Sequence, residues 1–424
     1  MVPPFPEKTE NGFSNFRSVP NTGVIYVMER AAQQGFVYGA EDWCNLGQGA
    51  PETNILPGAP ARLEKITVDS VRAEYSPVAG MRPLREAVAS LYNERYRKGR
   101  KSQYSWKNVA ISSGGRAGLT RVAAALGRIN LGHFLPDYTA YEELLDLFRV
   151  FVPIPIVNQE LRLPRPDELA FEIKSRGLGG LLLSNPVNPT GNMVYGDDLK
   201  GWIKVCRELS CTLILDEFYS HYLYGQARKV EGLSASACRY VGDVEQDQVL
   251  VVDGLTKNWR YPGLRLSWTI GPEHVIEKIA SAGSFLDGGA SHPIQKAALE
   301  LINPTVADAE ARAIQSAFDR KRELVEGTLE RWRWPVFEES LGGFYAFPCL
   351  SGLPESLRDG RKFFEACLAE KVICVPGEFF DVNPGQRRQQ ESRLKEYVRL
   401  SFGPSYEEVA EGVARIEKIV AAHS

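Results

Sequence analysis

The chain has 424 residues, 44% hydrophobic and 24% charged, the balance of an ordinary globular protein long enough for two or three domains. Its 50 Lys and Arg residues nearly match its 53 Asp and Glu residues, which disfavours a general nucleic-acid binder, because such proteins need a basic surface. No apolar run approaches the roughly 20 residues that cross a bilayer, and the N-terminus lacks the pattern of a secretory signal. We therefore expect a cytoplasmic protein without a membrane span.

The cysteine and histidine residues give no sign of a metal centre. The seven cysteines are scattered and form no CxxC pair, and the five histidines show no metal-ligand spacing. We expect no metal ion and no disulfide framework, which suits a reducing compartment.

The N-terminal part of the chain is irregular. Residues 1–45 show no sustained periodicity and contain four prolines within the first 20 positions, which favours an extended arm lying on another surface. The first helical pattern follows in residues 84–96, where apolar side chains recur on one helix face at Leu84, Ala87, Val88, Leu91 and Tyr92. We assign residues 1–75 to the arm and to part of a small domain.

Six short apolar runs alternate with helical segments in the central part of the chain. They lie at 108–113, 133–136, 180–184, 211–217, 249–254 and 266–271. Several are apolar at successive positions, as in strands of a mostly parallel sheet that helices cover on both faces. Between two runs, one apolar helix face is formed by Leu199, Trp202, Ile203, Cys206 and Leu209. We therefore predict an α/β domain over residues 76–305.

The C-terminal part predicts a smaller α+β domain over residues 306–424. It begins with a charged helical stretch at about 306–333, continues with the strand-like pieces GGFYAFP and VICVPG, and ends in an amphipathic helix. The segment 385–396 is almost wholly polar, so we interpret it as a solvated loop or a surface helix.

Polar residues follow three of the predicted buried strands. Asp216 ends one strand, Lys257 follows another, and the turn SNPVNPTGN (184–192) follows a third. Alone, a lysine at a strand end is more often a surface residue, and an aspartate there is usually a helix cap. Three polar clusters at the ends of buried strands indicate a ligand site, because open α/β sheets bind ligands at that edge.

These segments resemble the class I/II aminotransferases, pyridoxal-phosphate enzymes of fold type I, in which a mostly parallel sheet is sandwiched by helices. The resemblance runs in order over nearly the whole chain, and its most specific parts are NPVNPTG, DEFY and a lysine followed eight positions later by an arginine. The matching segments are NLGQGAPET, YSPVAGMRPLREA, ISSGGRAGL, LPDYTAY, SNPVNPTG, LILDEFY, GLTKNWRYPGLR, GGFYAFP, VICVPGEFF and YVRLSFG.

The resemblance implies roles around the cofactor ring. Lys257 matches the lysine that holds the cofactor aldehyde as a Schiff base and moves the substrate proton. Asp216 matches the acid that pairs with the pyridine nitrogen. Tyr219 and Asn188 match the residues that hydrogen-bond the 3′ oxygen, and Tyr138 matches the aromatic residue that stacks on the ring.

The resemblance also implies where the anionic groups bind. The cofactor phosphate would meet the start of a helix and a guanidinium group, contributed by Gly114, Gly115, Arg116, Thr256 and Arg265. Tyr75 matches a tyrosine that reaches the phosphate from the second subunit, which implies a homodimer. Arg399 matches the arginine that binds the substrate carboxylate, and Gly49 and Asn188 line the substrate.

The implied activity is the exchange of an amino group between an L-amino acid and a 2-oxo acid by a ping-pong mechanism. The same apparatus serves lyases, cyclases and oxidases, and a non-enzymatic sensor is a further alternative. The chain also departs from the family pattern near the lysine: Gly254 stands where relatives often have a serine, and Arg260, Tyr261 and Ser267 replace smaller or aliphatic residues. We expect a divergent member with its own substrate.

Overall fold

The computed structural model describes residues 23–157, 162–335 and 340–423. Its centre is a seven-stranded sheet in which every neighbouring pair is parallel except those that involve β8. The order across the sheet is β2 (Val109–Ser112), β8 (Ser267–Ile270), β7 (Val249–Gly254), β6 (Thr212–Asp216), β5 (Leu178–Ser184), β3 (Asn130–Leu135) and β4 (Val152–Val157).

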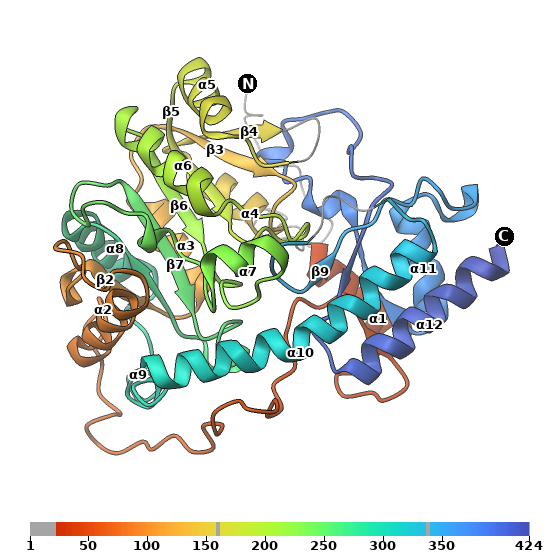
Figure 1. Ribbon diagram of the computed structural model, residues 1–424, viewed down its shortest axis with the longest axis horizontal. Helices are drawn as coiled ribbons and strands as arrows, with labels where there is room; N and C mark the ends of the chain where they lie inside the picture. The colour runs from red at the N-terminus through yellow and green to blue at the C-terminus, as the bar shows by residue number, and fades with distance from the viewer. Residues whose placement is uncertain (1–22, 158–161, 336–339, 424) are drawn as a thin grey trace, which may run out of the picture.

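Helices cover both faces of this sheet (Figure 1). Leu213 and Leu215 of β6 pack in the core under one set of helices, α2 (Arg82–Tyr96), α5 (Pro166–Arg176) and α6 (Gly196–Glu208). Ile214 packs in the core under the other set, α3 (Gly115–Ala125), α4 (Tyr141–Leu147) and α8 (Glu273–Leu286). Because successive side chains of a strand point to opposite faces, residues 213–215 of β6 are apolar at every position, as predicted for a sheet buried on both sides.

A second group of elements surrounds two small sheets. β9 (Tyr345–Ala346) and β11 (Val375–Pro376) flank β12 (Val398–Ser401) in antiparallel pairs, and β1 (Cys44–Asn45) pairs with β10 (Val372–Ile373). Helices α11 (Gly360–Ala369) and α12 (Tyr406–His423) pack here, and the long helix α10 (Pro304–Arg331) runs from the central sheet to this group (Figure 1). The pairing of β1 with β10 supports our proposal that the N-terminal segment joins residues 306–424 in a small domain.

The interpretation of residues 1–45 as an extended arm is wrong for part of that range. Residues Gly23–Gln33 form helix α1, which buries Val27 and Ala31 and contacts β10, β11 and the short 3-10 helix Gly377–Phe380. Its apolar face recurs with helical spacing, but the proline-rich context concealed it. Residues 1–22 lie outside the described part of the chain.

Strand β4 was also missed, because Pro153 and Pro155 interrupt its apolar pattern. It lies at the edge of the sheet, where proline is tolerated because one side of the strand needs no ladder hydrogen bonds. The remaining regular elements are α7 (Gly225–Glu231), α9 (His292–Ala298) and the 3-10 turns Trp106–Asn108, Ala237–Arg239, Pro262–Leu264, Glu355–Leu357 and Pro384–Gln386. Beyond that last turn, residues 387–396 form a mostly exposed loop.

Among the described residues, no helix has the length and apolar character required to cross a membrane. The same part of the chain contains no cluster of three or more His, Cys, Asp or Glu side chains that could hold a metal ion.

The packing of α6 on the sheet yields a stability prediction. Trp202 is fully buried, stacks on Phe134 with ring centroids 5.4 Å apart, and donates from Nε1 to the Pro164 carbonyl at 2.9 Å. Trp202→Ala should lower the free energy of unfolding by about 3–5 kcal/mol, because it leaves a cavity and an unpaired carbonyl. Denaturation in guanidinium chloride measures the loss, and Lys200→Ala, on the exposed face of the same helix, should stay within about 0.5 kcal/mol of the parent protein.

Candidate active site

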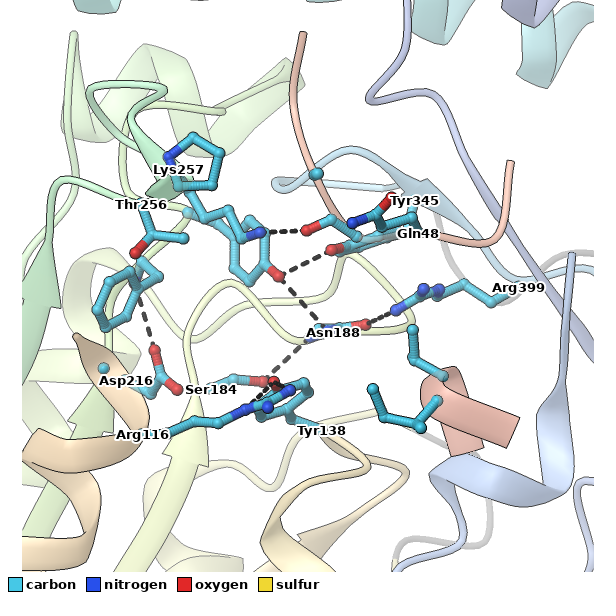
Figure 2. Close-up of a pocket in the computed structure, with 18 of the residues that line it drawn as sticks. Gln48, Arg116, Tyr138, Ser184, Asn188, Asp216, Thr256, Lys257, Tyr345 and Arg399 are labelled. Atoms are coloured by element: carbon cyan, nitrogen blue, oxygen red, sulfur yellow. Dashed lines mark hydrogen bonds between the residues drawn. The ribbon is translucent and has the colours of Figure 1, made fainter. Parts of the chain in front are cut away.

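The predicted strand-end residues meet at one edge of the central sheet. β3, β5, β6 and β7 run parallel, so the segments that follow them leave the sheet on the same side. They enclose a cavity of about 380 Å³ that also reaches α1 and the small sheet with β9 and β12. Figure 2 shows the side chains that point into it. Its position agrees with the rule that open α/β sheets bind ligands beyond the carboxyl ends of their strands.

Lys257 lies three residues beyond β7 and is partly buried at the top of the cavity (Figure 2). Its Nζ donates to the Gly49 carbonyl. Burial, followed by the positive charges of Arg399, Arg265 and Arg116, lowers the pKa of Lys257 to about 7. A large fraction of this amine is therefore neutral near pH 7 and available as a nucleophile or a base.

Asp216 is the last residue of β6 and is buried. Its carboxylate accepts a bond from the Tyr141 hydroxyl at 2.9 Å and a longer one from the Phe218 backbone N–H at 3.4 Å. Burial raises the pKa of Asp216 to about 6, against the opposing effects of these bonds and of the nearby Lys257. A cation placed beside this carboxylate would stabilise its ionised form.

Tyr219, Asn188 and Tyr345 form a hydrogen-bonded row in the cavity, and Figure 2 labels Asn188 and Tyr345. The hydroxyl groups of Tyr219 and Tyr345 are 2.8 Å apart, and the Asn188 amide donates to Tyr219 at 3.4 Å. The Asn188 backbone N–H donates to Ser184 Oγ at 3.1 Å. The row presents hydroxyl and amide groups from two strand ends and from the small sheet on a single wall.

One end of the cavity is built to receive an anion. Gly114, with φ of 92°, turns the chain into α3, whose first residue is Gly115. A side chain at Gly114 would lie 2.3 Å from Nη2 of Arg265 and would displace that guanidinium group from the start of the helix, and the φ of 92° also favours glycine. Free backbone N–H groups, the helix dipole and the guanidinium group together favour a phosphate. Thr256 also lines this cavity.

Tyr138 lies after β3 at the bottom of the cavity (Figure 2). Its hydroxyl accepts from Nε and Nη2 of Arg116 at 3.2 and 3.0 Å. The side chain of Arg116 is thus bound to the Tyr138 hydroxyl. The backbone of Arg116 lies in the first turn of α3, on the side of the anion-binding turn.

Arg399, on β12 of the small antiparallel sheet, lines the part of the cavity that faces the strand ends of the central sheet. It is 1% exposed, donates to the Asn188 side-chain oxygen at 2.8 Å and to the Gly47 carbonyl at 2.5 Å, and lies 4.4 Å from the Tyr345 ring centroid. Within the described residues its Nε has no hydrogen-bond partner. A buried guanidinium group with unused donor capacity is suited to a carboxylate ligand.

The structure thus brings most of the predicted site residues together. Those that line the one cavity are Gly49, Gly115, Arg116, Tyr138, Asn188, Asp216, Tyr219, Thr256, Lys257, Arg265 and Arg399, and Gly114 adjoins Arg265. Tyr75 does not line it and is 96% exposed.

Sequence reasoning missed several lining residues. Tyr345 lies within the GGFYAFP segment, which resembles the family but for which the sequence predicts no role of the tyrosine. Gly49 makes room for it, since a side chain at Gly49 would lie 2.5 Å from the Tyr345 hydroxyl. The other unpredicted members include Val24, Ile25 and Met28 of α1, together with Tyr38, Gln48, Leu119, Ser184 and Phe218.

The family model for aminotransferase class I and II matches residues 41–416. The chain therefore belongs to this family, and the family, the fold type and the aminotransferase class of enzyme predicted from sequence are confirmed.

Individual relatives agree with this assignment. The chain is 25% identical over 383 residues to an aspartate aminotransferase of Pyrococcus horikoshii, covering 89% of this chain and 90% of the relative. It is 27% identical to a probable aspartate/prephenate aminotransferase of Aquifex aeolicus, covering 89% and 91%. The fold is similar to the crystal structure of an aminotransferase from Mycobacterium tuberculosis, with a TM-score of 0.77, 23% identity, and coverage of 96% and 98%.

The lowered pKa of Lys257 can be measured directly. In the protein without cofactor, Lys257 should react with acetic anhydride at a rate that rises with pH and is half-maximal near pH 7, because only the neutral amine attacks. Mass spectrometry of labelled peptides gives the rate for each lysine. Lys204, whose side chain is 72% exposed, serves as the solvent-exposed reference lysine in the same digest. A profile for Lys257 that matches that of Lys204 would contradict the electrostatic account.

Proposed function

We propose that the chain uses pyridoxal phosphate to exchange an amino group between an L-amino acid and a 2-oxo acid in a ping-pong reaction. The observation that carries this proposal is the Lys257 amine, whose pKa is lowered to about 7. This amine shares one cavity with the buried Asp216, the turn beside Arg265 that is suited to an anion, and the buried Arg399. Family membership supports the same reaction.

The residues fit the parts of this cofactor. Lys257 offers an amine for the aldehyde, and Asp216 offers a buried carboxylate for the ring nitrogen. Tyr219 and Asn188 present polar groups for the ring oxygen. Tyr138 forms the opposite wall, where an aromatic ring can stack on the cofactor. The phosphate would be held at the start of α3 by the N–H groups of Gly115 and Arg116, together with Gly114, Thr256 and Arg265.

When bound, pyridoxal phosphate supplies an aldehyde that condenses with amino groups and a ring that accepts negative charge from the substrate Cα. Asp216 favours the protonated ring nitrogen, because a carboxylate of low solvent access stabilises a positive charge beside it. The neutral Lys257 amine would accept a proton from the substrate Cα at Nζ and would deliver it to the carbon of the former cofactor aldehyde, which is the proton shift that amino-group transfer requires. Its pKa near 7 allows both directions at neutral pH.

Arg399 orients the substrate. Its two bonds to Asn188 and the Gly47 carbonyl hold the guanidinium plane in place, and Tyr345 packs beside it. A carboxylate that binds the remaining N–H groups would be fixed relative to Lys257, with Gly49 and Asn188 also lining the substrate. Fixing the reacting atoms in this way lowers the entropic part of the barrier.

We also propose that the enzyme works as a homodimer in which Tyr75 reaches the neighbouring active site. Tyr75 is 96% exposed, and other apolar side chains on the same extended segment and on α8 are more than 60% exposed: Ile55, Val68, Val71 and Phe285. Exposed apolar groups along one extended segment are typical of an interface.

All seven cysteines are free, which supports a cytoplasmic location.

The proposal is tested by incubating the holoenzyme with individual amino acids carrying ¹⁵N and with several 2-oxo acids. The names of the relatives place aspartate and prephenate in this panel. Transfer of ¹⁵N to the 2-oxo acid is the expected outcome. Release of ammonia or peroxide without transfer would instead indicate a lyase or an oxidase.

The role of Lys257 is tested by borohydride reduction followed by peptide mapping. We expect the reduced cofactor on Lys257, and no ¹⁵N transfer by Lys257→Ala, because that variant lacks both the anchoring amine and the base. Lys204→Ala serves as the exposed control. A reduced cofactor on another lysine contradicts the assignment.

Arg399→Lys should raise KM for the amino acid by about 10- to 100-fold, equivalent to roughly 1.4 to 2.8 kcal/mol. An ammonium group cannot reproduce the paired parallel bonds of a guanidinium to a carboxylate. The cofactor spectrum and cofactor affinity should remain nearly unchanged. Steady-state kinetics checks this, with Arg393→Lys on an exposed loop as the control. Weakened cofactor binding in Arg399→Lys would place the substrate carboxylate elsewhere.

A further inference from the structure

We propose that Arg260 is a positioning residue that holds residues 49–54, the substrate side of the cavity, against the loop that carries Lys257. The expected effect of Arg260 on KM rests on the proposed function, whereas its role in holding residues 49–54 follows from the contacts below. Arg260 lies three residues after Lys257, at a position where the sequence departs from the family pattern.

Arg260 is fully buried and connects three parts of the chain. Its backbone N–H donates to the Lys257 carbonyl at 3.0 Å. Its Nη1 donates to the carbonyls of Glu52 at 3.0 Å and Asn54 at 2.6 Å, and its Nε donates to Glu310 of α10 at 2.6 Å. One guanidinium group therefore joins the lysine loop, the segment 49–54 and the long helix.

A second arginine makes the reverse connection. Arg62, from the segment that continues beyond residue 54, donates to the carbonyls of Trp259 at 3.1 Å and Arg260 at 2.6 Å. It also lies 3.6 Å from the ring centroid of Tyr261, whose hydroxyl accepts from the Leu63 N–H at 2.6 Å. Both residues that depart from the pattern, Arg260 and Tyr261, thus bind the same segment.

The segment held in this way separates the two functional sides of the cavity. On one side, the Gly49 carbonyl accepts from Lys257. On the other, the Glu52 N–H donates to the Gly403 carbonyl at 2.8 Å, two residues beyond the strand of Arg399. Arg260 therefore helps to fix the spacing between the amine and the carboxylate-binding guanidinium group.

A simpler role would be to neutralise Glu310. The two side chains form a buried pair, 0% and 1% exposed, and removal of one partner from such a pair destabilises a protein, whereas replacement of both by apolar residues often does not. The carbonyl contacts of Nη1 are additional to that pair. Separate variants can therefore distinguish charge balance from positioning.

The test compares Arg260→Met/Glu310→Met with Glu310→Gln. The double variant removes the Arg260–Glu310 pair and the carbonyl contacts of Nη1 together, so KM for the amino acid should rise about tenfold. Glu310→Gln keeps the carbonyl contacts, so its Tm should fall while KM stays within about twofold of the parent. If KM rises equally in both variants, or in neither, the positioning role is overturned.

A second measurement does not depend on activity. Hydrogen exchange of the cofactor-free protein reports the amides of Glu52 and Leu63, which bond to Gly403 and Tyr261. We expect about tenfold faster exchange at both amides in the double variant and little change in Glu310→Gln. Unchanged exchange in the double variant would overturn the positioning role of Arg260. A wild-type enzyme that transfers no amino group would instead refute the proposed function, and the exchange result would still decide the role of Arg260.

Discussion

The proposed active site depends on a buried lysine amine whose pKa is lowered by the positive charges around it. Lys257 shares its cavity with Arg116, Arg265 and Arg399, and their charges add to burial in lowering its pKa. Arg265 lies where the phosphate is expected and Arg399 where the substrate carboxylate is expected, and Arg116 binds the Tyr138 hydroxyl. In the proposed mechanism, the charges that would bind the phosphate and the carboxylate therefore also lower the pKa of the amine that would act as the base.

The arrangement also explains why the site needs two structural units. Asp216 ends β6, and Lys257 follows the neighbouring strand β7 by three residues, so the central sheet provides a rigid frame for both. Arg399 and Tyr345 come from neighbouring strands of the small antiparallel sheet. A hydrogen bond from Arg399 to Asn188 and one between the hydroxyl groups of Tyr345 and Tyr219 connect the two frames directly. The geometry of the cavity is consequently set by how closely the frames approach.

The sequence allowed the central sheet and its strand-end residues to be predicted, because strands buried on both faces are continuously apolar. Asp216 and Lys257 stood out as polar residues at the ends of such runs. Their partners could not be predicted in this way: Tyr141 contacts Asp216 from 75 positions away, and Tyr345 contacts Tyr219 from 126 positions away. Such contacts depend on tertiary packing, whereas periodicity reports only local structure. Helix α1 was missed because neighbouring prolines favoured an irregular chain.

Helix α1 has an implication for how this enzyme could diversify. It lies outside residues 41–416, which the family model matches, yet Val24, Ile25 and Met28 form part of the cavity wall. The residues that would perform the proposed chemistry and this part of the cavity wall are thus encoded in separate stretches of the chain. Under the proposed function, substitutions in α1 would change the cavity wall and leave the residues at the strand ends in place, so substrate preference would be able to evolve separately from the reaction.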